Sequence, residues 1–159
     1  MESQAVTNNC IFCNKVINVQ DNPLVVTKND AIAAFLDIFP RTRGHLIIAP
    51  TKHFYTLADI SVDLRIKLME SINIFAKVLM NFGAKGVNIG TNSGEAAGQQ
   101  VRHLHFHLIP RYKDRDAIEI EPAFTHTAWK KKCIVLSDEE MVSISNELKK
   151  YYETELKFY

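Results

Sequence analysis

The sequence has few cysteines, little net charge and no long hydrophobic run, and each shortage excludes a class of protein. Its 159 residues include 3 cysteines, too few for the disulfide framework of a small secreted protein. A formal net charge of +1 gives no broad electrostatic field to attract nucleic acid or an anionic membrane surface. We therefore expect no nucleic-acid or membrane partner, and a small ligand instead.

Signals for secretion or membrane insertion are also missing. Residues 1–9 are polar and lack the basic start and apolar stretch of a signal peptide. No run approaches the roughly 18 apolar residues that could span a bilayer, so we expect an intracellular, cytoplasmic protein. With 47% hydrophobic residues the chain is long enough for one core and too short for two ordinary domains. Residues 1–159 are expected to form a single domain.

Hydrophobic patterns predict the secondary structure. Short apolar runs indicate strands at residues 24–27, 31–37, 45–50, 86–91 and 101–109. Pro110 is expected to end the last strand. Apolar residues at spacings of three and four predict a long helix over about residues 59–82, and the capping-box pair Ser137 and Glu140 predicts a C-terminal helix. We expect an α+β domain with a largely antiparallel sheet.

Three histidines alternate with apolar residues in the segment VRHLHFHLIP, residues 101–110. Because successive side chains of a strand point to opposite faces, His103, His105 and His107 are expected to share one face. Imidazoles titrate near pH 6.5, so three neighbouring rings repel one another unless a metal or an anion compensates. The row predicts either a metal site, such as zinc with an open position for water, or a site for an anionic ligand.

A second set of metal ligands begins with the motif CIFC. Cys10 and Cys13 place two thiols on a tight turn, the usual first half of a structural zinc site. His53 follows one predicted strand and His103 begins another, so neighbouring strands would bring both imidazoles beside this turn. Two cysteines and two histidines make a closed site, which is structural because zinc keeps no open position. The alternative is a pair of buried thiols; Cys133 stands apart and is expected to be structural or inert.

The loop NSGEAAGQQ, residues 92–100, precedes the histidine row. Its glycines let backbone N–H groups approach an anion closely, and its small side chains leave room for one. Many hairpin loops have a similar composition. Beside the histidines, this loop predicts a phosphate-binding segment.

Together these segments resemble the histidine triad family, whose motif is His-x-His-x-His followed by apolar residues. The motifs that carry the resemblance, in the order and near the spacing of the family, are CIFC from residue 10, AFLDI from 34, GHLIIAP from 44, TKH from 51 and NSGEAAGQQVRHLHFHLIPR from 92. The CxxC start is similar to the zinc-bearing, bacterial-type members of the Hint branch, which commonly use the first triad histidine as a zinc ligand. Asn14 is one residue more than the usual spacing after the second cysteine.

The resemblance implies a hydrolase or transferase that acts at the α-phosphate of a purine nucleotide, in a homodimer whose two sheets join. The substrate would be a phosphoramidate or a dinucleoside polyphosphate. His105 would attack phosphorus and form a nucleotidyl-histidine that water then cleaves. His107 would stabilise the phosphoryl oxygens as charge develops.

The resemblance also implies which residues bind the nucleotide. Phosphate contacts match Asn92, Gly98, Gln99 and Gln100, and Asp37 matches the acid that binds the ribose hydroxyls. Phe12, Phe35 and Ile38 would line the base pocket, although Phe35 and Ile38 are equally consistent with ordinary core positions.

Two other functions stay open at this point. One is a nucleotide-binding regulatory protein whose catalysis is incidental, and the other is an enzyme whose histidine row itself holds a catalytic zinc. His45 is expected near the phosphate, in either a catalytic or a packing role. The sequence assigns no role to His126 or Trp129.

Overall fold

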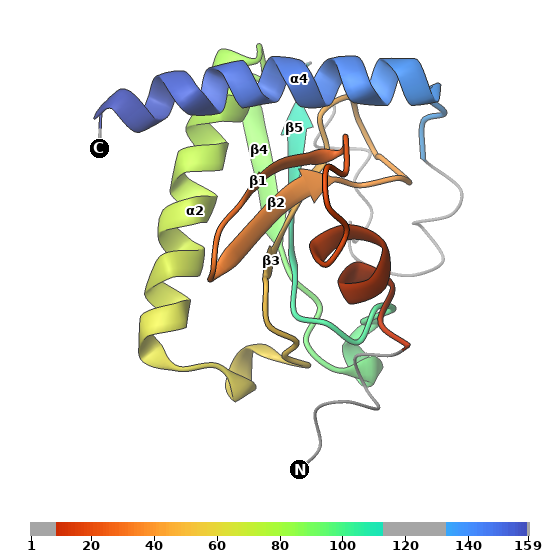
Figure 1. Cartoon of the computed structure of the whole chain (residues 1–159), viewed down its shortest axis with the longest axis vertical. Helices are drawn as coiled ribbons and strands as arrows, with labels where there is room; N and C mark the ends of the chain where they lie inside the picture. The colour runs from red at the N-terminus through yellow and green to blue at the C-terminus, as the bar shows by residue number, and fades with distance from the viewer. Residues whose placement is uncertain (1–8, 113–132, 159) are drawn as a thin grey trace.

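The computed structural model describes residues 9–112 and 133–158, which form a five-stranded sheet and two long helices (Figure 1). The sheet has the order β1-β2-β3-β5-β4, and every neighbouring pair is antiparallel. This confirms the expected α+β fold. The strands are β1 (Val25–Lys28), β2 (Ile32–Leu36), β3 (Leu46–Pro50), β4 (Gly86–Gly90) and β5 (Phe106–Arg111). The helices are α2 (Val62–Asn81) and α4 (Asp138–Glu155), with shorter turns at η1 (Cys13–Ile17), η2 (Leu57–Asp59), η3 (Glu95–Ala97) and η4 (Leu156–Phe158).

The two faces of the sheet bury different elements. On one face, Ile48 and Leu108 pack with α2 and α4 in the main core. On the other face, Phe35 and Ile47 pack against the N-terminal turn around η1, and Figure 1 shows α2 and this turn on opposite sides of the strands. His107 is paired with Ile47, and paired residues of antiparallel strands share a face. His107 therefore lies on the side of η1, away from the helices.

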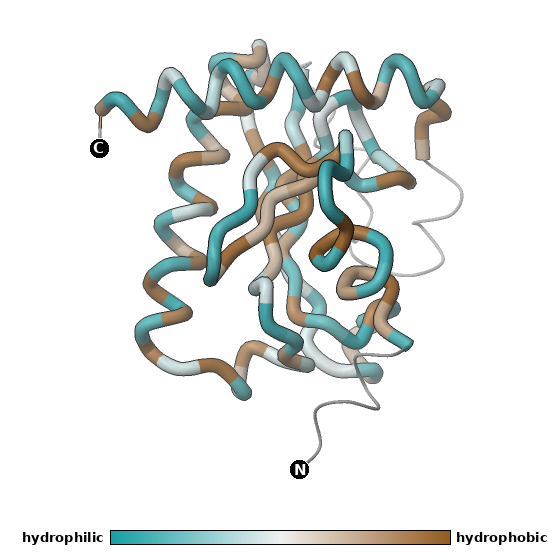
Figure 2. The backbone as a smooth tube through the Cα atoms, viewed as in Figure 1, coloured by the Kyte–Doolittle hydropathy of each residue, from teal (hydrophilic) through white to brown (hydrophobic). Residues whose placement is uncertain are grey.

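The predicted helix signals are confirmed. Ser137 accepts a hydrogen bond from the backbone N–H of Glu140, whose side chain bonds back to the N–H of Ser137, and this capping box begins α4. Helix α2 begins at Val62 rather than near residue 59, because Leu57–Asp59 forms a separate 3₁₀ turn. Hydrophobic and hydrophilic residues alternate along both helices (Figure 2), as expected for helices that each bury one face.

The histidine segment enters the sheet later than expected. Strand β5 begins at Phe106, so His103 and His105 precede the strand. There the backbone N–H of Leu104 donates instead to the carbonyl of Phe54, at 2.7 Å. Alternation still holds, because Leu104 packs in the main core while His103 and His105 contact the N-terminal turn. The shared face was predicted correctly, and the start of the strand was wrong.

Pro110 does not end β5, contrary to the expectation from sequence. It lies inside the strand, opposite Val87 of β4. The pairing of β3 with β5 stops at Leu108, so no β3 residue requires an N–H at Pro110. The Pro110 carbonyl accepts a hydrogen bond from Thr42 Oγ1 at 2.8 Å. A missing N–H is tolerated where the neighbouring strand has ended.

Among the described residues, none of the helices is both long and apolar enough to cross a membrane.

We expect Gly44→Ala to destabilise the protein by about 2 kcal/mol, although it adds one methyl group. Gly44 has a φ of +82°, and an added Cβ would lie 2.9 Å from Cε1 of Phe82. Gly86→Ala is the matched control, because an added Cβ there meets nothing within 4 Å and the φ of Gly86 is not positive. The free energy of unfolding, measured by urea denaturation, should change by no more than about 0.5 kcal/mol in the control. Equal losses in both variants would contradict the steric explanation.

Candidate functional site

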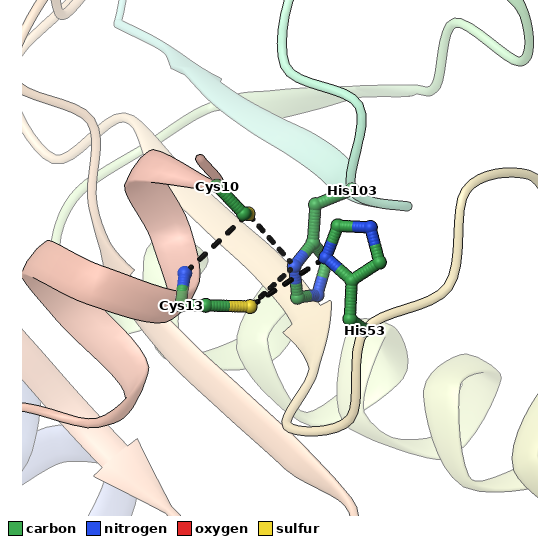
Figure 3. A group of neighbouring side chains, drawn as sticks. All are labelled: Cys10, Cys13, His53 and His103. Atoms are coloured by element: carbon green, nitrogen blue, oxygen red, sulfur yellow. Dashed lines mark hydrogen bonds between the residues drawn. The ribbon is translucent and has the colours of Figure 1, made fainter. Parts of the chain in front are cut away.

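Four side chains expected to hold a metal come together beside η1 (Figure 3). The ligand atoms of Cys10, Cys13, His53 and His103 all lie within 4.8 Å of one another. Cys10 Sγ is 3.4 Å from Nδ1 of His103, and Cys13 Sγ is 3.5 Å from Nδ1 of both His53 and His103. Zinc bonds of about 2.3 Å to sulfur and about 2.0 Å to nitrogen place tetrahedral ligands roughly 3.5 Å apart. The four residues therefore fit a zinc ion.

The protonation of these groups also suits a cation. Burial and the neighbouring Cys10 raise the pKa of the Cys13 thiol to about 12. Burial lowers the pKa of His103 to about 4 and lowers that of His53, so both imidazoles are neutral near pH 7. His103 Nε2 lies 2.9 Å from the Pro50 carbonyl, which can only accept, so the proton is on Nε2 and Nδ1 faces the sulfurs. Two thiolates here would need positive charge that neither neutral imidazole supplies.

His105, the expected nucleophile, has a defined tautomer. Its Nδ1 lies 2.6 Å from the backbone carbonyl of His103, so Nδ1 donates and carries the proton. The ring meets Phe12 edge to face at 5.1 Å and His107 at 4.9 Å between centroids. Burial lowers the pKa of His105. The result is a neutral imidazole whose Nε2 carries a lone pair for nucleophilic attack.

Of the residues expected at the base, Phe12 lies beside His105 and Phe35 lies against Phe12. The Phe12 and Phe35 rings meet edge to face at 5.2 Å. Ile38 is placed differently: its side chain is 58% exposed. It lines a hollow of 280 Å³ whose other walls are Pro23, Leu24, Pro40, Leu136, Asp138, Met141 and Val142. Neither His105 nor His107 lines this hollow.

Gln99, expected to contact phosphate, is buried and holds the loop together. Its Oε1 accepts from the backbone N–H of Gly94 at 2.7 Å. Its Nε2 donates to the carbonyls of Tyr55 at 2.8 Å and Val101 at 3.1 Å. These bonds use both N–H groups and the oxygen of the amide. The sequence places Gln99 in this loop but does not show that its side chain turns inward.

The other expected phosphate contacts are more accessible. Asn92 and Gly98 are half-buried and Gln100 is exposed. Asn92 Nδ2 donates to the carbonyl of Gly98 at 3.2 Å. Gly98 has a φ of +82°, a left-handed conformation that suits glycine. Gln100 also lines a hollow of 460 Å³ beside the cysteines, together with Asn9, Cys10, Ile11, His53, Val101 and Arg102.

The structure gives His45 a position that the sequence did not define. His45 is fully buried, and its Nε2 lies 3.1 Å from Nδ1 of His107. The backbone N–H of Arg41 donates to His45 Nδ1 at 3.2 Å. Burial, followed by the positive charges of Arg41 and Arg111, lowers the pKa of His45 to about 3. The available signal was a histidine at the start of a buried strand, but no spacing along the chain pairs residue 45 with residue 107.

Asp37, expected at the ribose, lies against this pair of imidazoles. Its Oδ2 is 3.7 Å from Nδ1 of both His45 and His107. Its Oδ1 accepts from the backbone N–H of Phe39 at 2.8 Å. Burial raises the pKa of Asp37 to about 6, and the Phe39 hydrogen bond partly opposes this rise. His126 and Trp129, which had no assigned role, lie outside the described residues.

A family model described as the HIT domain matches residues 18–114, a stretch that includes the three histidines and the loop at residues 92–100. The chain belongs to the HIT family. An uncharacterized HIT-like protein of Methanocaldococcus jannaschii is 40% identical over 104 residues, which cover 65% of this chain and 80% of the relative. The adenosine 5'-monophosphoramidase of Schizosaccharomyces pombe is 34% identical over 103 residues, covering 64% of this chain and 74% of that relative.

Solved structures share the HIT fold of this chain. The crystal structure of a zinc-bound histidine triad family protein from Mycobacterium smegmatis matches it with a TM-score of 0.74 and 22% identity. The match covers 96% of this chain and 99% of the neighbour.

We expect His45 to make the protein less stable in acid. Because the pKa of His45 falls from 6.5 to about 3 on folding, the folded chain binds fewer protons than the unfolded chain between these values. The contribution of His45 to the free energy of unfolding is fully present above pH 6.5 and is lost as the pH falls toward 3. Relative to His45→Phe, the wild-type chain should lose about 3 kcal/mol between pH 6.5 and about pH 4.

Urea unfolding of both proteins across this pH range measures that difference. Because the pKa of Asp37 is raised, Asp37 stabilises the folded chain as the pH falls, which is the opposite of the effect of His45. Asp37 is present in both proteins, so its effect largely cancels in the comparison. Parallel pH profiles for the two proteins would show that His45 is not buried as a neutral imidazole.

Proposed function

We propose that this HIT protein hydrolyses a purine nucleotide at its α-phosphate, through a nucleotidyl-histidine intermediate on His105. The observation that carries the proposal is the tautomer of His105, whose Nδ1 donates to the His103 carbonyl and leaves Nε2 as the nucleophile. The relative named adenosine 5'-monophosphoramidase supports this class of reaction. A phosphoramidate or a dinucleoside polyphosphate is the proposed substrate.

The reaction would proceed in two displacements at phosphorus. First, Nε2 of His105 bonds to phosphorus while the bond to the leaving group breaks, and the leaving group takes up a proton from solvent. The modified imidazole keeps its proton on Nδ1, and the His103 carbonyl stabilises the positive charge that the ring gains. Water then attacks phosphorus and gives one proton back to solvent, the bond to Nε2 breaks, and the nucleoside monophosphate is released. His107 would stabilise the phosphoryl oxygens in both steps.

The nucleotide would lie across the face that η1 covers. We propose that Asn92, Gly98 and Gln100 contact the phosphate, while Gln99 stabilises the loop from inside. Phe12, beside His105 in the structure, would contact the base together with Phe35 and Ile38. Asp37 is proposed to bind the ribose hydroxyls. This role and that of Ile38 at the base rest on the positions of the two residues in the family motifs alone.

Zinc is the proposed structural cofactor, held by Cys10, Cys13, His53 and His103. When bound, it would neutralise the thiolates and cross-link three segments that are distant in the sequence. The zinc-bound protein from Mycobacterium smegmatis supports this assignment at the level of the fold.

We also propose a homodimer in which two sheets join through β4. Within the described residues, β4 has a neighbouring strand on one side only, and Ile89 of this strand is exposed. Helix α2 contacts β4 and exposes Ile66 and Met69. An open strand edge next to exposed apolar side chains is suited to pairing with a second copy. Sedimentation velocity tests this assembly.

We expect His105→Ala to lower the turnover of an adenosine phosphoramidate by at least about a thousandfold, because the nucleophile is removed. Nucleotide affinity and the melting temperature should change little. Val135→Ala, at a side chain that is 97% exposed, is the control and should keep the parent rate. Parent-level turnover in His105→Ala would exclude the proposed intermediate.

The same assay should compare a phosphoramidate, a dinucleoside polyphosphate and an aminoacyl adenylate. If the wild-type protein binds nucleotides tightly but turns over every substrate far below about one per second, a regulatory nucleotide-binding protein is the better description.

We expect Cys13→Ser and the Cys10→Ser, Cys13→Ser double variant to lose one equivalent of zinc. Both should also lose several kcal/mol of stability, since structural zinc binding is linked to folding. His105→Ala should keep the zinc. Elemental analysis after dialysis, with thermal unfolding, measures both properties. The opposite pattern, with zinc lost only in His105→Ala, would place the metal on the histidine row instead.

A further inference from the structure

The proposed reaction needs different properties from two neighbouring imidazoles. The nucleophile, His105, must present an unprotonated nitrogen to phosphorus. His107, which stabilises the phosphoryl oxygens, must present an N–H, because a nitrogen lone pair would repel them. Their rings lie 4.9 Å apart at the centroids; His105 is buried and His107 is largely buried, with 12% of its side chain exposed. Position alone therefore does not distinguish their roles, and a hydrogen-bond partner must fix the proton on each ring.

For His107 the partner is His45, and the backbone N–H of Arg41 determines the direction of the hydrogen bonds. A backbone N–H can only donate, so the Arg41 N–H at 3.2 Å makes Nδ1 of His45 an acceptor. A neutral His45 then carries its proton on Nε2. That Nε2 lies 3.1 Å from Nδ1 of His107, and the proton between them makes Nδ1 of His107 the acceptor. A neutral His107 consequently carries its own proton on Nε2.

The neutral state of both rings follows from burial. Burial, followed by nearby positive charges, lowers the pKa of His45 to about 3. Burial, followed by the charges of His45, His105 and Arg41, places the pKa of His107 well below 6.5. Each ring therefore holds one proton near pH 7, and the hydrogen bonds decide which nitrogen holds it.

We propose that His45 is a positioning residue that fixes His107 in the Nε2–H tautomer, as a hydrogen-bond donor to the phosphoryl group. This rests on the proposed function of the same site. His105 and His107 then carry their protons on opposite nitrogens. His105 donates through Nδ1 to the His103 carbonyl and attacks through Nε2, whereas His107 accepts through Nδ1 from His45 and donates through Nε2.

Asp37 is the competing candidate for orienting His107. Its Oδ2 lies 3.7 Å from Nδ1 of His107, which is beyond hydrogen-bond distance, whereas Nε2 of His45 lies at 3.1 Å. If Asp37 were the partner, His107 would carry its proton on Nδ1, toward the carboxylate. The two assignments therefore predict opposite tautomers of one ring.

Nitrogen-15 NMR of the nucleotide-free, wild-type protein with labelled histidine separates the two tautomers. We expect His45 and His107 as Nε2–H tautomers and His105 as the Nδ1–H tautomer. A His107 proton on Nδ1 in the wild-type protein would overturn the proposal. This readout needs neither turnover nor a variant that folds, so it is independent of whether the proposed reaction is correct.

Variants of His45 test whether this residue causes the Nε2–H tautomer of His107. In His45→Phe, which keeps a ring and removes both hydrogen bonds, His107 should populate both tautomers, and kcat should fall about 10- to 100-fold with KM changed less than about threefold. His45→Gln, whose amide N–H can donate to His107, should restore most of the kcat and the single tautomer. Asp37→Asn should leave the tautomer of His107 unchanged. An unaltered His107 spectrum in His45→Phe, or a changed one in Asp37→Asn, would contradict the proposal.

Discussion

The backbone carbonyl of His103 is the group on which the arrangement of the site depends. It accepts the Nδ1–H of His105, while the imidazole of the same residue faces the thiols of Cys10 and Cys13. The ring is fixed in turn by the Pro50 carbonyl at the end of β3. One residue therefore connects the candidate metal-ligand cluster, the central sheet and the proposed nucleophile. A shift of the chain at His103 would move the candidate ligand and the proposed nucleophile together.

The sheet allows this arrangement because its two faces bury different kinds of residues. The face covered by α2 and α4 buries a large apolar core. The opposite face carries the polar groups, and the N-terminal turn covers it with a smaller apolar cluster that includes both cysteines and Phe12. Burial keeps the histidines neutral. Because His103 and His105 contact this turn, the segment with the candidate metal-ligand cysteines is also part of the cover that sets their protonation.

Local sequence patterns correctly predicted those features of the site that depend on residues close together in the sequence. The period of two placed His103, His105 and His107 on one face, and the CxxC spacing led to the four-residue cluster. The contact between His45 and His107 was not predictable in this way, because it joins residues 62 apart and depends on the register that pairs Leu46 with Leu108. The inward turn of Gln99 and the tolerance of Pro110 likewise depend on tertiary partners that composition does not reveal.

The hydrogen bonds also argue against a metal held by the histidine row itself. His103 directs Nδ1 at the thiols and Nε2 at the Pro50 carbonyl, so neither nitrogen faces a site shared with His105. His107 directs Nδ1 at His45. Without His103 the row offers only His105 and His107, and two imidazoles fall short of the three ligands that a catalytic zinc usually has. The alternation that first suggested a three-histidine metal site therefore supports the proposed anion site, in which one nitrogen would attack and its neighbour would donate.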